Sequence, residues 1–108
     1  MDLKSEDGKQ KFFDLVKTAD IVVDSFRPGV LQKMGIDYDH AKQHNEKIIY
    51  VAITGYGYTG AYKNLAGHDM NYLGYSGILG LSGDEEKPTL AACQIADVAG
   101  GSYPAVVA

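Results

Sequence analysis

Several features that mark particular classes of protein are scarce in this sequence of 108 residues. A single cysteine, Cys93, excludes an internal disulfide and is typical of a reducing compartment. No apolar run approaches the roughly 18 to 20 residues that a membrane-spanning helix needs, and the charged segment 1–11 lacks the apolar core of a signal peptide. Lysine and arginine are scattered and the net charge is -4, so no basic stripe could hold nucleic acid. We therefore expect a soluble, cytoplasmic protein that binds neither membranes nor nucleic acid.

The few histidines and the cysteine give no metal site or nucleophile by their spacing. His40 and His44 lie four residues apart and would share one face of a helix, as metal ligands sometimes do. No third ligand accompanies them, and the charged residues around them indicate a solvated face, so we expect no metal site. The neighbours of Cys93 supply no base or positive charge that would activate its thiol. We therefore expect Cys93 to be a small packed residue.

The first half of the chain alternates between helical and strand patterns. Ser5 is expected to cap a helix that closes at residues 18–20. The β-branched run 21–23 suits a buried strand of a parallel sheet, and residues 48–54 carry the strongest strand signal. This order predicts an α/β fold, part of an open, mostly parallel, Rossmann-like sheet with flanking helices.

Two short helices are expected between these strands. The first covers residues 30–34, with Pro28 suited to its first position and Gly35 at its end. The second follows directly, is capped by either Asp37 or Asp39 and runs through His44. Ligands of such sheets bind beyond the carboxyl ends of the strands, so the loops after both strands are candidate binding segments.

The second half of the chain is rich in glycine. Its apolar residues permit a helix over residues 69–81 that glycines interrupt, followed by a solvated turn over 82–88. Residues 98–108 are expected to be helical despite Pro104. Small residues in that last helix would let it approach a ligand or another helix closely.

The loop after the second strand and the nearby basic residues are weak indications of a ligand. Residues 55–60 have the G-x-G-x-x-G spacing, but no helix opens there, so a flexible loop or a general ligand contact is favoured over a nicotinamide or flavin site. Arg27 follows a predicted strand, where an arginine could bind phosphate. From spacing alone a surface arginine is the better interpretation, and Lys4 and Lys33 are equal candidates on the same ground.

The segment from Gly67 to Tyr72 is the strongest candidate for chemistry. It places the imidazole of His68 beside the carboxylate of Asp69, and only residues 96–101 offer a second carboxylate, Asp97, in a comparable setting of small residues. If the two segments meet, His68 and Asp97 form a pair of acid and base groups. The alternatives are a structural histidine at position 68, and aspartates 69 and 97 that each cap their own helix.

Several motifs taken together resemble one known family. They are residues 2–4, 26–31, 49–57, 67–69 and 96–97. In this order, and over essentially the whole chain, they resemble the class III coenzyme A transferase (CaiB/BaiF) family, which also contains α-methylacyl-CoA racemase. The resemblance implies a fragment of the large domain of an interlocked homodimer. Family members are several times longer, and a second domain completes their site, so we expect these 108 residues alone to be inactive.

Within that family the residue at position 68 discriminates between two reactions. A histidine there is similar to the racemase branch, whereas transferases more usually have tyrosine or another residue. The resemblance implies that His68 and Asp97 are the two proton-transfer residues of a racemase acting on a 2-methyl-branched acyl-CoA through an enolate. The alternative is a coenzyme A transferase in which Asp97 is the nucleophile and His68 only lines the pocket. Coenzyme A is then part of the substrate, and no permanently bound cofactor is expected.

The resemblance also implies which residues contact the acyl-CoA substrate. Arg27 and the segment at the amino end match positions around the coenzyme A nucleotide, and the segment around His68 lines the thioester. The expected contacts are Asp2, Leu3, Lys4, Arg27, Lys33, Gly67, Asp69, Met70, Asn71 and Tyr72. We therefore expect one partial domain, in which residues 1–66 form the α/β part that binds coenzyme A and residues 67–108 form a helical segment with the catalytic pair.

Overall fold

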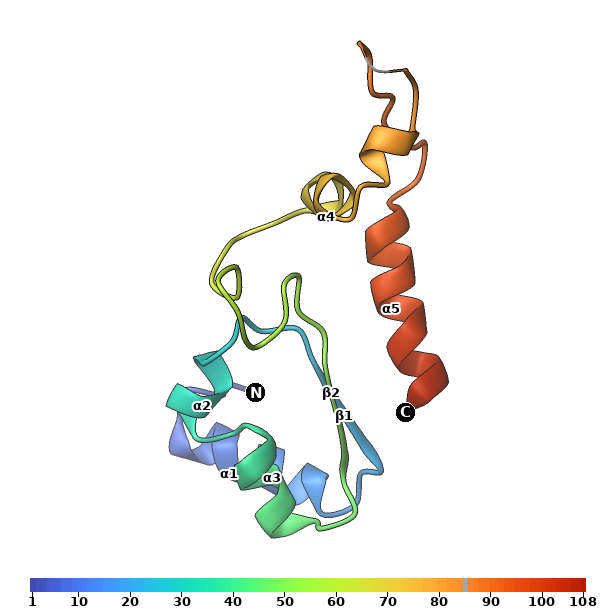
Figure 1. The fold of residues 1–108 in the computed structure, drawn as a ribbon. Coiled ribbons are helices and arrows are strands. Elements are labelled where there is room, and N and C mark those ends of the chain that lie inside the picture. The colour runs from blue at the N-terminus through green and yellow to red at the C-terminus, as the bar shows by residue number, and fades with distance from the viewer. Residues whose placement is uncertain (85) are drawn as a thin grey trace. The chain divides into compact units, whose positions relative to one another are not determined.

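The computed structural model describes residues 1–84 and 86–108. In chain order the elements of this described part are α1 (Glu6–Val16), β1 (Ile21–Asp24), α2 (Val30–Met34), α3 (Tyr38–His44), β2 (Ile49–Ala52), α4 (Asp69–Tyr75), the 3-10 helix η1 (Leu79–Leu81) and α5 (Ile95–Val107) (Figure 1). They group into two compact units, residues 1–54 with Ala108, and residues 55–107. The sequence predicts a different division, between residues 66 and 67, which separates the part expected to bind coenzyme A from the part expected to carry the catalytic pair. That division stays a prediction.

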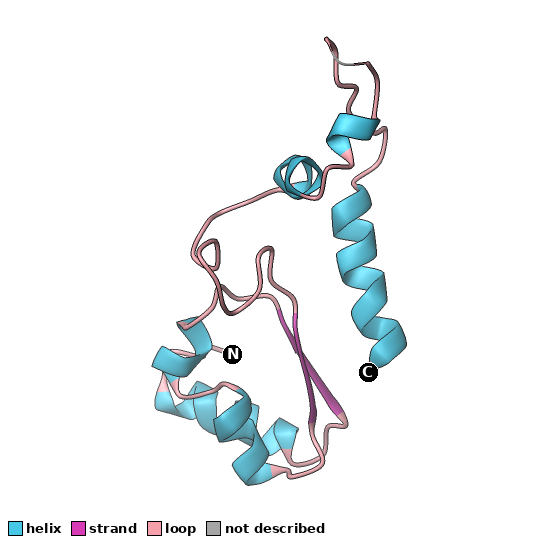
Figure 2. Cartoon of the chain, in the orientation of Figure 1, coloured by secondary structure: helices cyan, strands magenta, loops and turns pink. Residues whose placement is uncertain are grey.

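The first unit contains a parallel pair of strands flanked by helices (Figure 2). Strand β1 pairs with β2 so that Ile21 lies opposite Ile49 and Asp24 opposite Ala52. The ladder continues at the carboxyl end, where the N–H of Ile53 donates to the Asp24 carbonyl at 2.8 Å. The predicted α/β class and the parallel pairing of these two segments are confirmed.

Within the first unit, the helices pack on one face of this strand pair. Tyr50 meets Tyr38 of α3 edge to face, with ring centroids 6.0 Å apart, and Figure 1 shows α1, α2 and α3 gathered on one side of the strands. Alternate residues of a strand point to opposite faces, and on the other face Ile21 is 45% exposed and Val23 is 61% exposed. The expectation of a buried strand at 21–23 is therefore wrong for this unit, because α1 and α3 pack on the opposite face.

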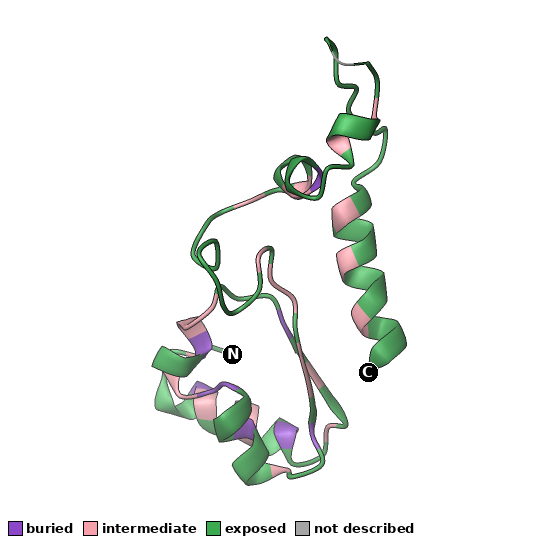
Figure 3. Cartoon of the chain, viewed as in Figure 1, coloured by how far each residue is buried: buried purple, intermediate pink, exposed green. Residues whose placement is uncertain are grey.

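The core of the first unit lies between its helices and the strand pair (Figure 3). Its buried apolar residues come from the helices and the ends of their connections, and they are Val16, Leu31, Ile36, Ala41 and Ile48. Asn45 joins the ends of two helices, because its Nδ2 donates to the carbonyls of Val16 and Ala19 at 3.1 and 2.9 Å. These bonds fasten the end of α3 to the end of α1.

Local capping explains where the short helices begin and end. Ser5 caps α1 as predicted, because its hydroxyl oxygen accepts from the N–H of Gly8 at 3.0 Å. Asp37, and not Asp39, caps α3. Gly35 ends α2 with φ of 71°, in the left-handed region that favours glycine. The predicted ranges of both short helices are confirmed.

Pro28 is not the first residue of α2, contrary to the prediction. It lies in a turn closed by a hydrogen bond from the N–H of Val30 to the carbonyl of Arg27 at 3.1 Å. Gly29 then occupies the position before the helix with φ of 85°. A proline fixes its own φ near -65°, so the left-handed step falls on the glycine that follows it.

The second unit contains the interrupted helix that the sequence predicts. Helix α4 stops before Gly77, which has φ of 83°, and η1 follows. The predicted helix over 98–108 begins earlier, at Ile95, so Asp97 lies in its first turn. In the turn over 82–88 Gly83 and Pro88 form an antiparallel bridge, whereas Glu85 lies outside the described residues. Among the helices of the described part, none is both long and apolar enough to cross a bilayer.

The Asn45 bonds can be tested by substitution. Asn45→Ala removes the donor to two carbonyls, and an unsatisfied carbonyl at a half-buried position costs stability. We expect the free energy of unfolding to fall by about 1–3 kcal/mol in urea titrations. Gln43→Ala, an exposed position on the same helix, is the control. Equal losses for the two variants would show that the Asn45 bonds do not hold α1 and α3 together.

Candidate active site

The segments around His68 and Asp97, far apart in the sequence, meet in the second unit. Oδ1 of Asp69 accepts hydrogen bonds from the N–H groups of Ala96 and Asp97 at 2.6 and 3.2 Å. Figure 1 shows α4 beside the start of α5. The segments that carry His68 and Asp97 are thus joined by hydrogen bonds to the backbone, as the predicted pair of acid and base groups requires.

His68 is held at the start of α4 with its imidazole exposed. It is the N-cap residue of that helix, in an extended conformation. Its N–H donates to Oδ1 of Asn71 at 2.9 Å, and its carbonyl accepts from the N–H of Asn71 at 2.9 Å. The side chain of Asn71 therefore satisfies the backbone at this end of the helix. The backbone of His68 is therefore fixed at the start of α4.

The two aspartates do not cap their own helices. Asp69 is the first residue inside α4, and its carboxylate binds the start of α5 instead. Asp97 is exposed within the first turn of α5, and the carboxylate of Asp69 accepts from its N–H. The proton-transfer roles of His68 and Asp97 stay predictions.

Tyr72 fits against two glycines, and this contact shapes the segment before His68. A Cβ at Gly67 would lie 2.7 Å from Cε1 of Tyr72, and one at Gly55 would meet the Tyr72 hydroxyl. A methyl group at either position would therefore force the Tyr72 ring or the local backbone to move. The ring of Tyr72 thereby packs α4 against the loop that precedes it.

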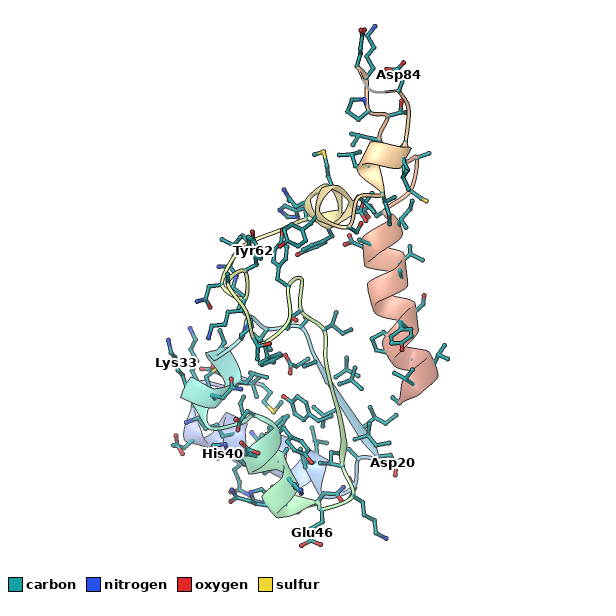
Figure 4. All side chains as sticks on the ribbon, viewed as in Figure 1. Asp20, Lys33, His40, Glu46, Tyr62 and Asp84 are labelled. Carbon is teal, nitrogen blue, oxygen red and sulfur yellow. The ribbon has the colours of Figure 1, made fainter. Side chains whose placement is uncertain are left out.

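A cluster of tyrosines surrounds this ring, and the sequence analysis missed it. Tyr56 lies edge to face with Tyr72 at 5.2 Å and with Tyr75 at 5.9 Å between ring centroids. Tyr62, labelled in Figure 4, packs on Tyr75 at 4.8 Å. A hydrogen bond with Tyr62 raises the pKa of the Tyr75 phenol above its usual range. The three-residue spacing of Tyr72 and Tyr75 on one helix could have indicated the cluster.

Most of the remaining expected contacts of the acyl-CoA substrate lie in the first unit. Asp2 begins a turn in which its Oδ1 accepts from the N–H of Lys4 at 2.9 Å, and Leu3 is half-buried there. Arg27 is exposed in the turn after β1, and Lys33 is exposed in the last turn of α2 (Figure 4). In the second unit Met70 is 52% exposed on α4. Their contacts with a substrate stay predictions.

The remaining histidines are engaged in local contacts. Nδ1 of His40 hydrogen-bonds to Oδ1 of Asp37, and His44 stacks on Phe13 with ring centroids 4.3 Å apart. Within the part that the structure describes, no group of three or more His, Cys, Asp or Glu is placed to hold a metal ion. Cys93 is exposed, so the expectation that it packs is wrong, because it lies in the open connection that precedes α5.

The chain is similar to known proteins over almost its whole length. The family model described as CoA-transferase family III matches residues 1–108. The chain belongs to this family. It is 39% identical over 94% of its length to the succinate–glutarate CoA-transferase of Agrobacterium fabrum, and 36% identical over 94% to the human alpha-methylacyl-CoA racemase. The crystal structure of a CaiB/BaiF family protein from Brucella suis covers 97% of the chain with a TM-score of 0.90 and 37% identity.

The family includes both racemases and CoA-transferases, so membership does not decide between the two reactions. The chain spans 26% of the Agrobacterium transferase, 27% of the human racemase and 28% of the Brucella chain.

The contact between Tyr72 and Gly67 can be tested by adding one methyl group. Gly67→Ala forces the ring or the backbone before His68 to move. We expect the free energy of unfolding to fall by about 1–3 kcal/mol, the usual cost of overpacking. Gly80→Ala is the control, because a Cβ there meets nothing within 4 Å. A cost of Gly67→Ala that persists in a Tyr72→Leu background would show that the ring is not the obstacle.

Proposed function

We propose that the complete protein transfers the α-proton of a 2-methyl-branched acyl-CoA thioester, with His68 and Asp97 as the two acid and base groups. The supporting observation is the pair of hydrogen bonds that Asp69 accepts, which join the residue after His68 to the first turn of α5. His68 and Asp97 are both exposed at the starts of their helices, where a substrate can reach them. The similarity to the human racemase over 94% of this chain agrees with the proposal.

The chemistry needs two groups on opposite sides of one carbon. A thioester carbonyl acidifies the proton on its α-carbon, because the negative charge left behind delocalises onto the oxygen as an enolate. One group removes that proton and the other returns a proton to the opposite face. One C–H bond breaks and one forms with inverted configuration. The reaction needs neither an oxidant nor a second substrate.

The coenzyme A part of the substrate requires its own contacts. In this proposal Arg27, Lys33 and the segment 2–4 bind the nucleotide, and residues 67–72 line the thioester. An exposed arginine in a turn after a parallel strand suits phosphate, because its guanidinium donates in a planar fork. The substrate brings the coenzyme A, and no permanently bound cofactor takes part.

The remaining expectations concern the whole protein. The parallel pair of β1 and β2 is proposed to be part of a larger Rossmann-like sheet, and Ile21 and Val23 on its uncovered face agree with further packing there. The protein is proposed to act in the cytoplasm as an interlocked homodimer. The larger sheet, the location and the homodimer are proposed because the chain resembles this family.

A coenzyme A transferase is the second candidate, and it uses only one of the two groups. Asp97 is exposed in the first turn of α5 and could attack a thioester carbonyl. Its carboxylate would displace coenzyme A as the thiolate and form an acyl anhydride, and the thiolate would then attack the Asp97 carbonyl and release the first acid. The second acid would take up the coenzyme A by the reverse steps. The similarity to the Agrobacterium transferase favours this candidate.

Isotope exchange separates the two candidates. In D2O, without an acceptor acid, the complete protein should convert one epimer of a 2-methylacyl-CoA into the other with deuterium at the α-carbon, as followed by chiral chromatography and mass spectrometry. His68→Ala and Asp97→Asn should each slow formation of the inverted epimer at least about a hundredfold, because each removes one proton carrier. Asp39→Asn, which changes an exposed carboxylate on α3, should react at the wild-type rate.

The opposite pattern identifies a transferase. The racemase proposal fails if the wild-type protein forms no deuterated epimer but moves coenzyme A from an acyl-CoA to a free acid. Loss of that exchange in Asp97→Asn, and its retention in His68→Ala, would assign Asp97 as the nucleophile.

A further inference from the structure

We propose that Asp69 is a positioning residue that sets the relative placement of His68 and Asp97, and this proposal rests on the proposed function. Oδ1 of Asp69 accepts from the N–H groups of Ala96 and Asp97 at 2.6 and 3.2 Å. The residue directly after His68 is therefore bonded to the backbone of Asp97 itself. Asp69 acts through these two bonds, and it need not contact the reacting carbon.

Helix α5 depends on Asp69 because it brings no good cap of its own. The first N–H groups of a helix lack partners within the helix, and Ser, Thr, Asp or Asn usually supplies one from the preceding residues. The residues before α5 are Ala92, Cys93 and Gln94, and none belongs to that group. Asp69, which is 27 residues away from Ala96, supplies the acceptor instead. Its negative charge also suits the positive end of this helix of 13 residues.

Little apolar packing competes with these bonds. None of the residues of α5 is buried, and Leu73 is the one buried residue among the described residues of 55–107. Asp69 is half-buried, whereas His68 and Asp97 are exposed. The carboxylate thus points into the junction of α4 and α5 and leaves the proposed pair facing outward. Charge-assisted bonds of this kind are stronger than bonds between neutral groups.

Loss of the two bonds should move the start of α5 relative to α4. Acid and base groups must approach one carbon at near-contact distance, and a misplacement of about 1 Å can cost about a hundredfold in rate. The same loss should expose the N–H groups of Ala96 and Asp97 to solvent exchange.

Two substitutions separate positioning from proton transfer by Asp69 itself. Asparagine keeps a carbonyl oxygen for the two N–H groups but cannot carry a proton, and alanine removes both abilities. In the complete protein we expect Asp69→Asn to retain epimer formation within about tenfold of wild type, and Asp69→Ala to lower kcat at least about a hundredfold with KM within about threefold. A large rise in KM with kcat unchanged would overturn the proposal, because the effect would then come from lost substrate binding and not from a misplaced pair of His68 and Asp97. A folded Asp69→Asn variant as inactive as Asp69→Ala would overturn it too.

Asp84 provides a matched control. Its Oδ1 also accepts from two backbone N–H groups, those of Glu86 and Lys87 at 3.0 and 2.7 Å, but these bonds close a local turn. Asp84→Ala should leave kcat and KM at the wild-type values. A loss of kcat equal to that of Asp69→Ala would show that any lost carboxylate cap has this effect, and it would contradict a specific role for Asp69.

Amide hydrogen exchange keeps this test separate from the test of the proposed function. In the complete protein, the peptide that contains Ala96 and Asp97 should exchange at least about tenfold faster in Asp69→Ala than in wild type, and near the wild-type rate in Asp69→Asn. If the wild-type protein forms no epimer, the proposed function fails, and faster exchange in Asp69→Ala alone still supports the structural link. Unchanged exchange in a folded Asp69→Ala variant would overturn the positioning role whatever the reaction is.

Discussion

The hydrogen bonds that Asp69 accepts from Ala96 and Asp97 are the constraint on which the candidate site depends. They connect two segments that the sequence separates by more than two dozen residues, and they do so at the residue adjacent to His68. One carboxylate therefore turns two separate motifs into one site.

Aromatic packing in the second unit also holds the segment around His68 in place. Tyr72 fills the space that Gly55 and Gly67 leave open, and Tyr56 packs edge to face on its ring. Aromatic pairs of this geometry add stability beyond the area that they bury. The segment that precedes α4 is thus held by packing against Tyr72, and the first residue of α4 is joined to the start of α5 by hydrogen bonds. His68 lies between these two attachments, with its imidazole exposed.

Features with local causes could be predicted from the sequence. The cap at Ser5, the left-handed glycine at position 35 and the interruption of the helix after α4 each follow from one or two neighbouring residues. The pairing of the two strands followed from their apolar runs and from the helices between them. The pattern of the chain therefore determines the α/β class and most boundaries of its elements.

Features that depend on distant residues could not be predicted in this way. An aspartate at the first position of α4 looks like a cap of its own helix, and nothing in its neighbourhood indicates that its carboxylate reaches α5. The missing cap before α5 is visible in the sequence, but it does not reveal which residue replaces it. The exposure of Val23 depends in the same way on which face of the strands the helices cover. The segments that form the site were thus recognisable, whereas the contact that joins them was not.

A crystal structure of the complete protein with an unreactive analogue of a 2-methylacyl-CoA tests the central claim most directly. The account predicts that the Asp69 carboxylate lies within hydrogen-bond distance of the N–H groups of Ala96 and Asp97, with the side chains of His68 and Asp97 on opposite sides of the analogue's α-carbon. Side chains that open into separate cavities, or a carboxylate of Asp69 turned away from α5, would contradict it.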